Sequence, residues 1–565
     1  MFVKVTSSGP RRYVQLVESY RDDNGRVKKR TVATLGRLED IRSQMGSVID
    51  GLLRIAGEPP RAEPAELPKP RFESARALGH VWALTELWRQ LGFSELRRVF
   101  RRTRHATDVE ALVRIMVFNR LCDPDSKRGV LRWLETVALP DIQVKAVTHQ
   151  QLLRSMDALL DHQEEVDAVV AALLRPLVDQ DLSVVFYDLT TIRAEGGTRQ
   201  QGDVRQFGIS KEGVIARQFM LGVVQTAEGI PLYHEVFDGN TSETTTLLPT
   251  VQKVLARFPS LKRVVLVADR GLLSLDNLEA LRAAQVRDGQ PLEFILAVPG
   301  RRYGEFTGLL ADFQARCKQA TDEVIGELKW NELRLVVAHD PVRAQEQSEL
   351  RKARLADLEK RADEYAQKLE AQSAGIKARG RKLSSSGAKA RVYHHVADAH
   401  LLKILKVDTA SDLFSYDLDE VALAKAELMD GKLLLVTNVA DLRPEQVIER
   451  YKSLADIERG FKVLKSEIEI GPVYHWLPER IRAHALICFI ALILHRVMRL
   501  RLRAGQTGIS PERALSLLQC IQHHRVLLDD KATLSGVSML DEDQTQALKA
   551  LEIRRPTDDA QLTLL

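Results

Sequence analysis

Three acidic residues lie at positions that favour metal binding or catalysis. Asp188 lies near the end of the β-rich run SVVFYDLTTI, Asp269 follows the apolar run RVVLVA directly, and Glu458 lies in an amphipathic stretch. Burying an unpaired charge is costly, so an aspartate at a strand end is expected to be solvated. Taken singly, each aspartate can also be a strand-end cap. Carboxylate oxygens without Cys or His partners favour Mg²⁺ or Mn²⁺, and two such ions can cleave a phosphodiester.

The stretch around Glu458 has a regular spacing. Tyr451, Glu458 and Lys465 follow one another at intervals of seven residues. Seven residues are nearly two helical turns, which predicts one helix over 451–470 with all three side chains on one face. Leu454, Ile457, Phe461 and Leu464 form an adjacent apolar stripe that would anchor this helix. We expect Tyr451 and Lys465 to grip the phosphate of a scissile strand on either side of Glu458. The alternative is an amphipathic helix with a solvated charged face.

The elements that must position these residues are predicted from periodicity. Residues 179–300 show the order β-β-β-α-β-α-β, beginning with a three-strand antiparallel meander. Such an order favours a mixed sheet with helices on both faces. Residues 301–429 break the pattern and are expected to form an insertion domain. Residues 430–505 resume the core with a strand at 430–438 and the helix that carries Glu458.

The flanking regions are less informative. Residues 72–178 are helical by period, and their arginine cluster predicts DNA binding, although an ordinary solvated helix end is equally expected. The cluster consists of Arg97, Arg98, Arg101, Arg102 and Arg104. The other predicted regions are a small basic β unit with a hairpin at 1–57, a Pro-rich linker at 58–71 and a helical C-terminal tail at 506–565.

Composition sets bounds on the class of protein. The 565 residues are 45% hydrophobic and 28% charged, which is typical of a globular protein with a sizeable core. The net charge of +5 permits nucleic-acid binding without requiring it. The four cysteines show no CxxC spacing, which predicts reduced thiols and a cytoplasmic location. The run 485–494 is too short to span a bilayer, so we expect a buried helix and no membrane partner.

These motifs resemble a known family. The string Tyr451-x2-Leu454-x3-Glu458-x6-Lys465 is similar to the Tyr-Arg-Glu-Lys signature of bacterial insertion-sequence DDE transposases of the IS-four type. Asp188 in FYDLTT and Asp269 in VADRGLLSLDNL resemble the first and second acidic residues of that family. The chain departs from the pattern at Leu454, where the family has Arg.

The resemblance implies a ribonuclease-H-like catalytic core interrupted before the Glu helix by an insertion domain. It implies that Asp188, Asp269 and Glu458 are catalytic and hold Mg²⁺ or Mn²⁺, as two ions. The expected partners are double-stranded DNA, as terminal inverted repeats and target, and further copies in a homodimer or larger synaptic complex. The expected location is the bacterial cytoplasm, at the nucleoid. Further DNA contacts are expected at Arg270, next to Asp269, and at Lys462, which with Arg459 is a candidate to replace the missing Arg.

Rival interpretations remain open from the residues alone. One is a ribonuclease-H-like DNA nuclease that cuts without joining strands. Another is a non-enzymatic DNA-binding protein derived from a transposase, which the three intact carboxylates disfavour. The segment Asp188-Leu-Thr-Thr also resembles the nucleophile loop of haloacid-dehalogenase-type phosphatases, but the β-meander that follows disfavours that fold. His475 and Trp476 are expected to pack rather than to react, and Trp330 to pack rather than to stack on a base.

Overall fold

We analysed a computed structural model of the chain. It describes residues 1–59, 70–101, 107–142, 147–178, 183–196, 200, 202–209, 215–269, 275–287, 289–317, 320–375, 383–408, 411–528 and 532–556. The described chain divides into two compact units, one of residues 1–72 with 526–534 and one of residues 73–525 with 535–565. The linker predicted for 58–71 lies mostly outside the described residues.

The N-terminal unit is a small antiparallel sheet followed by two helices. The predicted hairpin at Asp22–Gly25 is present, and Gly25 takes the left-handed conformation (φ +76°) that such a turn favours. A third strand precedes the hairpin and pairs with its first strand, so the unit has one strand more than the sequence predicts. Its elements are β1 (Phe2–Ser8), β2 (Arg11–Arg21), β3 (Val27–Arg37), α1 (Leu38–Ile41) and α2 (Met45–Ile55).

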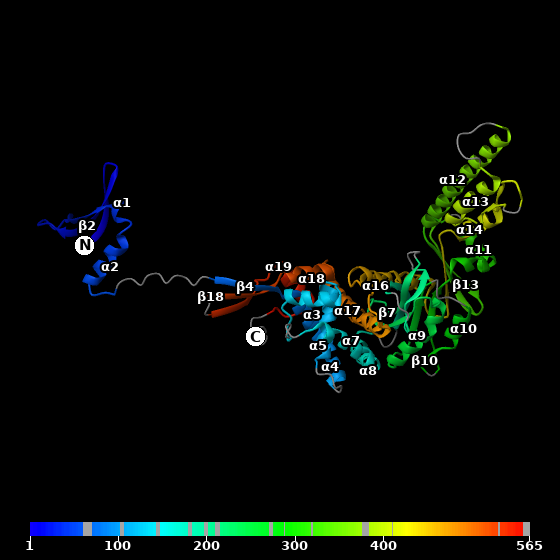
Figure 1. Ribbon diagram of the computed structural model, residues 1–565, viewed down its shortest axis with the longest axis horizontal. Helices are drawn as coiled ribbons and strands as arrows, with labels where there is room; N and C mark the ends of the chain where they lie inside the picture. Colours follow the sequence, from blue (N-terminus) through cyan, green and yellow to red (C-terminus); the bar gives the residue numbers. More distant parts are fainter. Residues whose placement is uncertain are drawn as a thin grey trace. The chain divides into compact units, whose positions relative to one another are not determined.

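The second unit is built around a large mixed sheet (Figure 1). Its strand order is β13-β14-β17-β12-β9-β5-β7-β6, and β8 also pairs with β7. The central pairs β5–β9 and β9–β12 are parallel, and the pairs toward both edges are antiparallel. The strands are β5 (Ser183–Arg193), β6 (Gln206–Ile209), β7 (Ile215–Thr226), β8 (Pro231–Asp238), β9 (Val264–Ala268), β12 (Glu293–Ala297), β13 (Val324–Trp330), β14 (Leu333–His339) and β17 (Lys432–Thr437).

The elements predicted for the first half of this core are present, and the structure adds strand β6 and a short hairpin before β12. β5, β7 and β8 form the antiparallel meander, and two helices make the crossovers to the parallel strands β9 and β12. β9 is buried at every position, as its unbroken apolar run predicts for a strand covered on both faces. The crossover helices are α9 (Glu243–Arg257) and α10 (Leu275–Ala283), and a short hairpin of β10 (Gln285–Arg287) and β11 (Gln290–Pro291) precedes β12.

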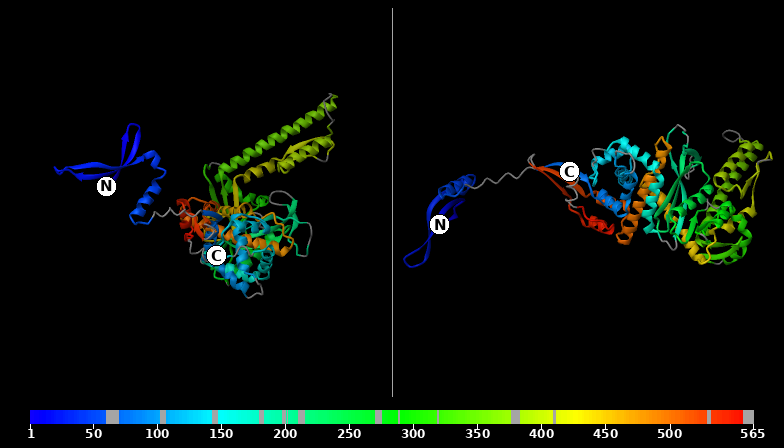
Figure 2. Two further views of the ribbon diagram at one scale, coloured as in Figure 1. Left: turned by 60° about the vertical axis from the view of Figure 1, so that its left-hand side comes forward. Right: turned by 90° about the horizontal axis from the view of Figure 1, so that it is seen from below.

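The expected insertion at 301–429 needs a correction. Strands β13 and β14 come from this range, yet β14 pairs with β17 and both extend the main sheet. The helix at 307–317 packs in the main core, and the part from 341 to 429 has its own small hydrophobic core around Leu358 and Val392. In Figure 2 the two longer helices of this part, α12 and α13, run side by side. The elements after β12 are α11 (Thr307–Cys317), α12 (Pro341–Ser373), α13 (Ser385–Asp398), β15 (Leu405–Val407), β16 (Tyr416–Leu418) and α14 (Glu420–Met429).

The helical region predicted for 72–178 is present and packs around one long helix. That helix, α17 (Pro478–Ala504), contacts α5, α7 and β8. It is the one helix of the described chain that is long and apolar enough to cross a membrane, and it is buried in the protein core as the sequence predicts. The helices before the sheet are α3 (Gly79–Gln90), α4 (Leu96–Arg101), α5 (Val109–Cys122), α6 (Lys127–Thr136), α7 (His149–Asp161) and α8 (Gln163–Leu174).

The C-terminal segment contains strands as well as helices, which corrects the expected all-helical tail. Two strands near 520–537 form a three-stranded sheet with a strand from the start of the helical region, in the order β19-β18-β4. The elements are β4 (Pro70–Ala77), α18 (Pro511–Gln519), β18 (Gln522–Leu528), β19 (Ala532–Val537) and α19 (Glu542–Ala550).

Candidate functional site

The register of two parallel strands brings Asp188 and Asp269 together. The last paired residues of β5 and β9 are Tyr187 and Ala268, so Asp188 and Asp269 are the next residues on adjacent strands. Paired residues of parallel strands project on the same face of the sheet. Asp188 is half-buried and accepts a hydrogen bond from the Leu189 N–H (2.7 Å), and Asp269 is exposed. The structure corrects one detail, because Asp188 lies in the middle of β5, which continues to Arg193, and not near a strand end.

The two aspartates face the helices that follow β17. The hydroxyl of Tyr187 donates a hydrogen bond to Thr246 on α9 (2.8 Å), so Tyr187 points to the α9 side of the sheet. Successive strand residues alternate between faces, which directs Asp188 to the opposite side. There α15 (Pro444–Lys452) packs against β9, and α16 (Ala455–Ser466) packs against β5.

The single helix predicted for 451–470 is wrong. The chain forms α15 and α16, separated by a turn at Ser453 and Leu454 in which the Leu454 N–H donates to the Tyr451 carbonyl (3.0 Å). Both turn residues keep right-handed helical dihedral angles, so the apolar period continues through the break. Tyr451 therefore ends one helix, whereas Glu458 lies on the next.

The apolar stripe of this segment is confirmed for its described side chains. Leu454, Phe461 and Leu464 are buried in the main core. The side chain of Ile457 lies outside the described part. Leu454, the position of the family's Arg, thus anchors the turn between the two helices by packing.

Tyr451 contacts the candidate site directly. Its hydroxyl donates a hydrogen bond to Oδ1 of Asp269 (2.9 Å). A hydrogen bond to a carboxylate fixes the orientation of that group. The sequence predicts a DNA contact for Tyr451, and its partner in the structure is a member of the carboxylate pair. A signal for this contact is absent from the sequence because it joins residues 182 positions apart.

Glu458 lies on α16, which packs against β5, the strand of Asp188. Among the described residues, no group of three or more His, Cys, Asp or Glu side chains is arranged to hold a metal ion. Glu458 is exposed on α16, two residues before Gly460. A Cβ atom at Gly460 would lie 2.6 Å from Nε2 of Gln225 on β7, so glycine is what allows α16 to approach the sheet closely.

The other residues predicted to contact DNA differ in their exposure and in their ion pairs. Lys465 is half-buried and Lys462 is exposed, both on α16. Arg270 lies outside the described residues. In the arginine cluster, Arg97 pairs with Glu110 (3.0 Å) and Arg98 with Glu95 (2.7 Å), so these two charges are partly neutralised within the protein. Trp330 packs against Phe306, as expected.

Two family models match this chain. Residues 179–494 match the model of the transposase DDE domain, and residues 3–64 match the model of the IS1634 family transposase N-terminal domain. A search of curated proteins finds no match.

Among solved structures, a piggyBac transposase synaptic complex with hairpin DNA is similar at 8% identity, covering 86% of this chain and 80% of that one. Its TM-score is 0.33. The DDE-domain match includes all three predicted carboxylates and spans more than half of the chain. The chain belongs to the transposase DDE domain family, and it is an insertion-sequence DNA transposase.

Proposed function

We propose that Asp188, Asp269 and Glu458 are the catalytic carboxylates of this transposase. In this proposal the enzyme cuts DNA at terminal inverted repeats and joins the 3′ ends to target DNA. The observation that carries the proposal is the parallel register of β5 and β9, because it makes two acidic residues lateral neighbours on one accessible face. Two adjacent carboxylates do not stabilise these otherwise apolar strands, because like charges side by side repel.

A divalent cation fits this pair. Members of the family generally use divalent metal ions, and the donors present are carboxylate oxygens, which favour Mg²⁺ or Mn²⁺. Asp188 and Asp269 would hold the ions, with Glu458 as a further ligand. Two bound ions would supply activation of the attacking oxygen and stabilisation of the leaving oxygen. The Tyr451 hydroxyl would keep the Asp269 carboxylate in a fixed orientation.

Glu458 has to approach the pair for this site to be complete. The helix that carries it begins at the turn of Ser453 and Leu454, and a turn of this kind can absorb a change in helix direction. Gly460, on the same helix, already lies against β7, the neighbour of β5. We therefore propose that α16 supplies Glu458 to the site of the aspartate pair when metal and DNA bind.

The remaining assignments complete the proposal. The sheet order and its crossover helices support a ribonuclease-H-like core in two parts, with the part outside the sheet as an insertion domain. Lys462, Lys465, Arg270 and Tyr451 would contact DNA, and the helical region before the sheet would bind it as well. We infer that the protein works in the cytoplasm, as a homodimer or larger synaptic assembly on DNA.

The test is a cleavage and strand-transfer assay with a labelled terminal repeat. Asp188→Asn, Asp269→Asn and Glu458→Gln should each lower both steps at least ~100-fold, since each removes a metal ligand. Glu449→Gln, at an exposed carboxylate of α15, is the matched control and should keep both rates. Full activity of Glu458→Gln would overturn its assignment. Cleavage without joined product would instead favour the nuclease, and DNA binding without cleavage the non-enzymatic protein.

A further inference from the structure

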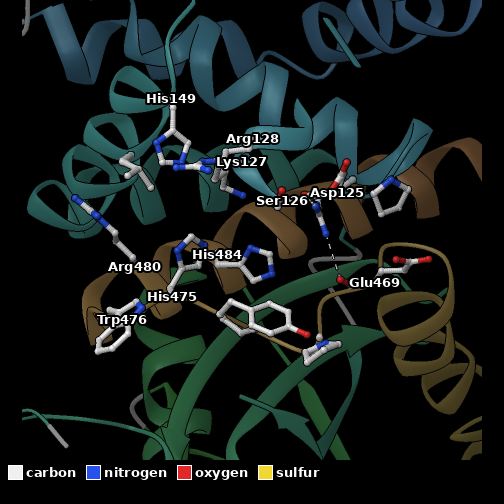
Figure 3. A pocket seen from close by; sticks show the side chains of 17 residues that line it. Asp125, Ser126, Lys127, Arg128, His149, Glu469, His475, Trp476, Arg480 and His484 are labelled. Atoms are coloured by element: carbon white, nitrogen blue, oxygen red, sulfur yellow. Dashed lines mark hydrogen bonds between the residues drawn. The ribbon is translucent and has the colours of Figure 1, made fainter. Parts of the chain in front are cut away.

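A pocket of about 580 Å³ lies apart from the aspartate pair, between the helical region and the segment that follows α16 (Figure 3). The first turns of three helices line it, through Lys127 of α6, His149 of α7 and Arg480 of α17. Segment 469–476 lines the other side. The volume is within the range of pockets that hold small organic ligands.

Acidic side chains match the positive charge at these helix starts only in part. Asp125 accepts a hydrogen bond from the Ser126 N–H (2.6 Å) at the start of α6, and Asp157 pairs with Arg480 of α17. A helix N-terminus carries a partial positive charge and stabilises negative groups. The first turns of α6 and α7 contain no acidic residue, and Lys127 stands at the first position of α6. The Lys127 side chain is 6% exposed, and the described residues include no carboxylate that pairs with it. Burial and the nearby Arg120 guanidinium lower the pKa of Lys127 to about 7.

Other buried polar atoms on the pocket wall also lack a hydrogen-bond partner among the described residues. Within the described part of the chain, Nδ1 of His484 and Nε of Arg120 have no hydrogen-bond partner, and both residues are buried. Nε2 of His484 faces the Ile470 carbonyl oxygen at 2.9 Å, so Nε2 donates and Nδ1 is left as an acceptor. Burial also lowers the pKa of His484, which keeps the ring neutral. The wall thus offers cations for an anion and an acceptor for an N–H or O–H group.

The acidic residues of the pocket leave much of this positive charge unbalanced. Arg132 donates a hydrogen bond to Asp125 (2.9 Å), so this carboxylate already has a cationic partner. Asp157 pairs with Arg480 (2.7 Å). Glu469 lines the pocket as well and is exposed to solvent. Lys127 and the exposed Arg128 are the cations that remain for a ligand.

Two aromatic side chains stand exposed at the same pocket. Tyr474 is 69% exposed and Trp476 is 60% exposed, so the packing expected for Trp476 is wrong. Their segment is fixed from behind, because the buried Arg205 donates to the carbonyls of His475 (3.3 Å) and Trp476 (3.2 Å). A large exposed aromatic ring on a fixed backbone is a stacking platform for a nucleobase.

We propose that this pocket binds one nucleotide of a DNA strand, with its phosphate against Lys127 and Arg128 and its unpaired base on Trp476. The proposal rests on the proposed function only in taking DNA as the ligand. The rim segment also pairs with the strand of Asp188, since Val473 N–H donates to the Arg193 carbonyl (3.0 Å) and Glu195 N–H to the Val473 carbonyl (2.8 Å). A nucleotide held here would therefore lie at a fixed place relative to the aspartate pair.

The test is equilibrium binding by the full chain, without divalent metal, so that it does not depend on catalysis. The probes are a fluorescein-labelled single-stranded oligonucleotide, the same sequence as a duplex, and a nucleoside monophosphate as competitor. Trp476→Ala should weaken single-strand binding roughly 10-fold, the effect of losing one base–aromatic stack. Arg128→Gln and Lys127→Gln should weaken single-strand binding to a similar extent. Each should also make the slope of log K against log salt concentration shallower by about one. Duplex binding should change far less.

Exposed residues elsewhere provide matched controls. Tyr393→Ala on α13 and Arg154→Gln on α7 remove an aromatic ring and a cation that do not line the pocket, and both should bind as the wild type does. Thermal unfolding of each variant separates a folding defect from a binding defect, and the exposed positions Trp476 and Arg128 are expected to fold normally. Unchanged single-strand binding by folded Trp476→Ala and Arg128→Gln would overturn the proposal.

The competitor distinguishes the source of the nucleotide. Tight binding of the free monophosphate with no effect of the variants on oligonucleotide binding would assign the pocket to a free nucleotide and overturn the DNA proposal. Normal strand transfer with lost single-strand binding would leave the carboxylate assignment intact. Normal cleavage by Asp188→Asn, together with lost single-strand binding in the pocket variants, would overturn the carboxylate assignment and leave the pocket assignment intact.

Discussion

The aspartate pair and the basic pocket are assembled by different means. Strand register brings Asp188 and Asp269 together, so their proximity is fixed by backbone hydrogen bonds of the central sheet. The pocket is assembled from helix starts and a loop, and its groups are held by side-chain contacts such as those of Arg205. The first arrangement gathers negative charge for a cation, and the second gathers positive charge for an anion. Two sites of opposite charge on one domain are what an enzyme needs if it holds a polyanion at one place and cuts it at another.

Removal of divalent metal should give the largest difference between the two sites, because it should affect cleavage and leave single-strand binding nearly unchanged. Chelation by EDTA should abolish cleavage, because the carboxylates lose the ions that activate the attacking oxygen. Single-strand binding at the pocket should change less than about twofold, because its groups are cations and aromatic rings that do not need a divalent ion. Cleavage is assayed with a labelled terminal repeat and binding by fluorescence anisotropy, with Mg²⁺ or Mn²⁺ added back as the control. Cleavage that persists in EDTA would contradict the metal site.

Substitution of Tyr451 should have a smaller effect, which is limited to the cleavage rate at the aspartate pair. Tyr451→Phe removes the hydroxyl that bonds Asp269, and a hydrogen bond to a charged group of this kind corresponds to roughly a 10-fold loss in cleavage rate. Single-turnover kinetics measure the change, and a higher metal concentration should restore part of the rate. Tyr393→Phe, on α13, is the control. A loss of DNA affinity with an unchanged rate would show that Tyr451 serves DNA binding instead.

Substitution of the buried lysine in the pocket should change the free energy of unfolding as well as DNA binding. Lys127→Met should raise the free energy of unfolding by on the order of 1–3 kcal/mol near pH 7, because it removes a buried cation without a paired carboxylate. The folded pKa of about 7 lies below the ordinary 10.5, so the unfolded chain binds more protons. The destabilisation by Lys127 is thus complete below pH 7 and fades as the pH rises toward 10.5.

Thermal unfolding of wild type and Lys127→Met at several pH values checks this prediction. The gap between the two proteins should narrow steadily from pH 7 to pH 10. A variant that is less stable than the wild type at pH 7 would mean that Lys127 serves the fold and not a ligand.

Much of the central core could be predicted from the sequence because its signals are local. The meander of β5, β7 and β8 follows from apolar runs separated by turn residues, and the buried strand before Asp269 from five consecutive apolar residues. Elements whose place depends on distant pairing were missed. β14 joins the sheet only through β17, almost a hundred residues later, and the turn that precedes β14 uses Asn331 and Glu332 in left-handed conformations without any glycine.

The site was predictable in its residue types and less so in its geometry. The carboxylates were identified by their surroundings in the sequence, but the break between α15 and α16 leaves the helical period intact and so gives no signal. The pocket was missed because its groups come from four separate segments. One local signal was present, since Lys127 follows the helix cap Ser126 where an acidic residue is favoured.

Strand β5 connects the two sites, through its own backbone and through backbone hydrogen bonds at its end. Asp188 stands in its middle, and its end at Arg193 is tied to the segment that carries Trp476. Five residues of extended chain span about 16 Å, the length of about five nucleotides in B-form DNA. If both sites engage one strand, β5 acts as a ruler that measures how far from a held nucleotide the cut is made. Lengthening that strand would then shift the cut along the DNA, whatever the base sequence there.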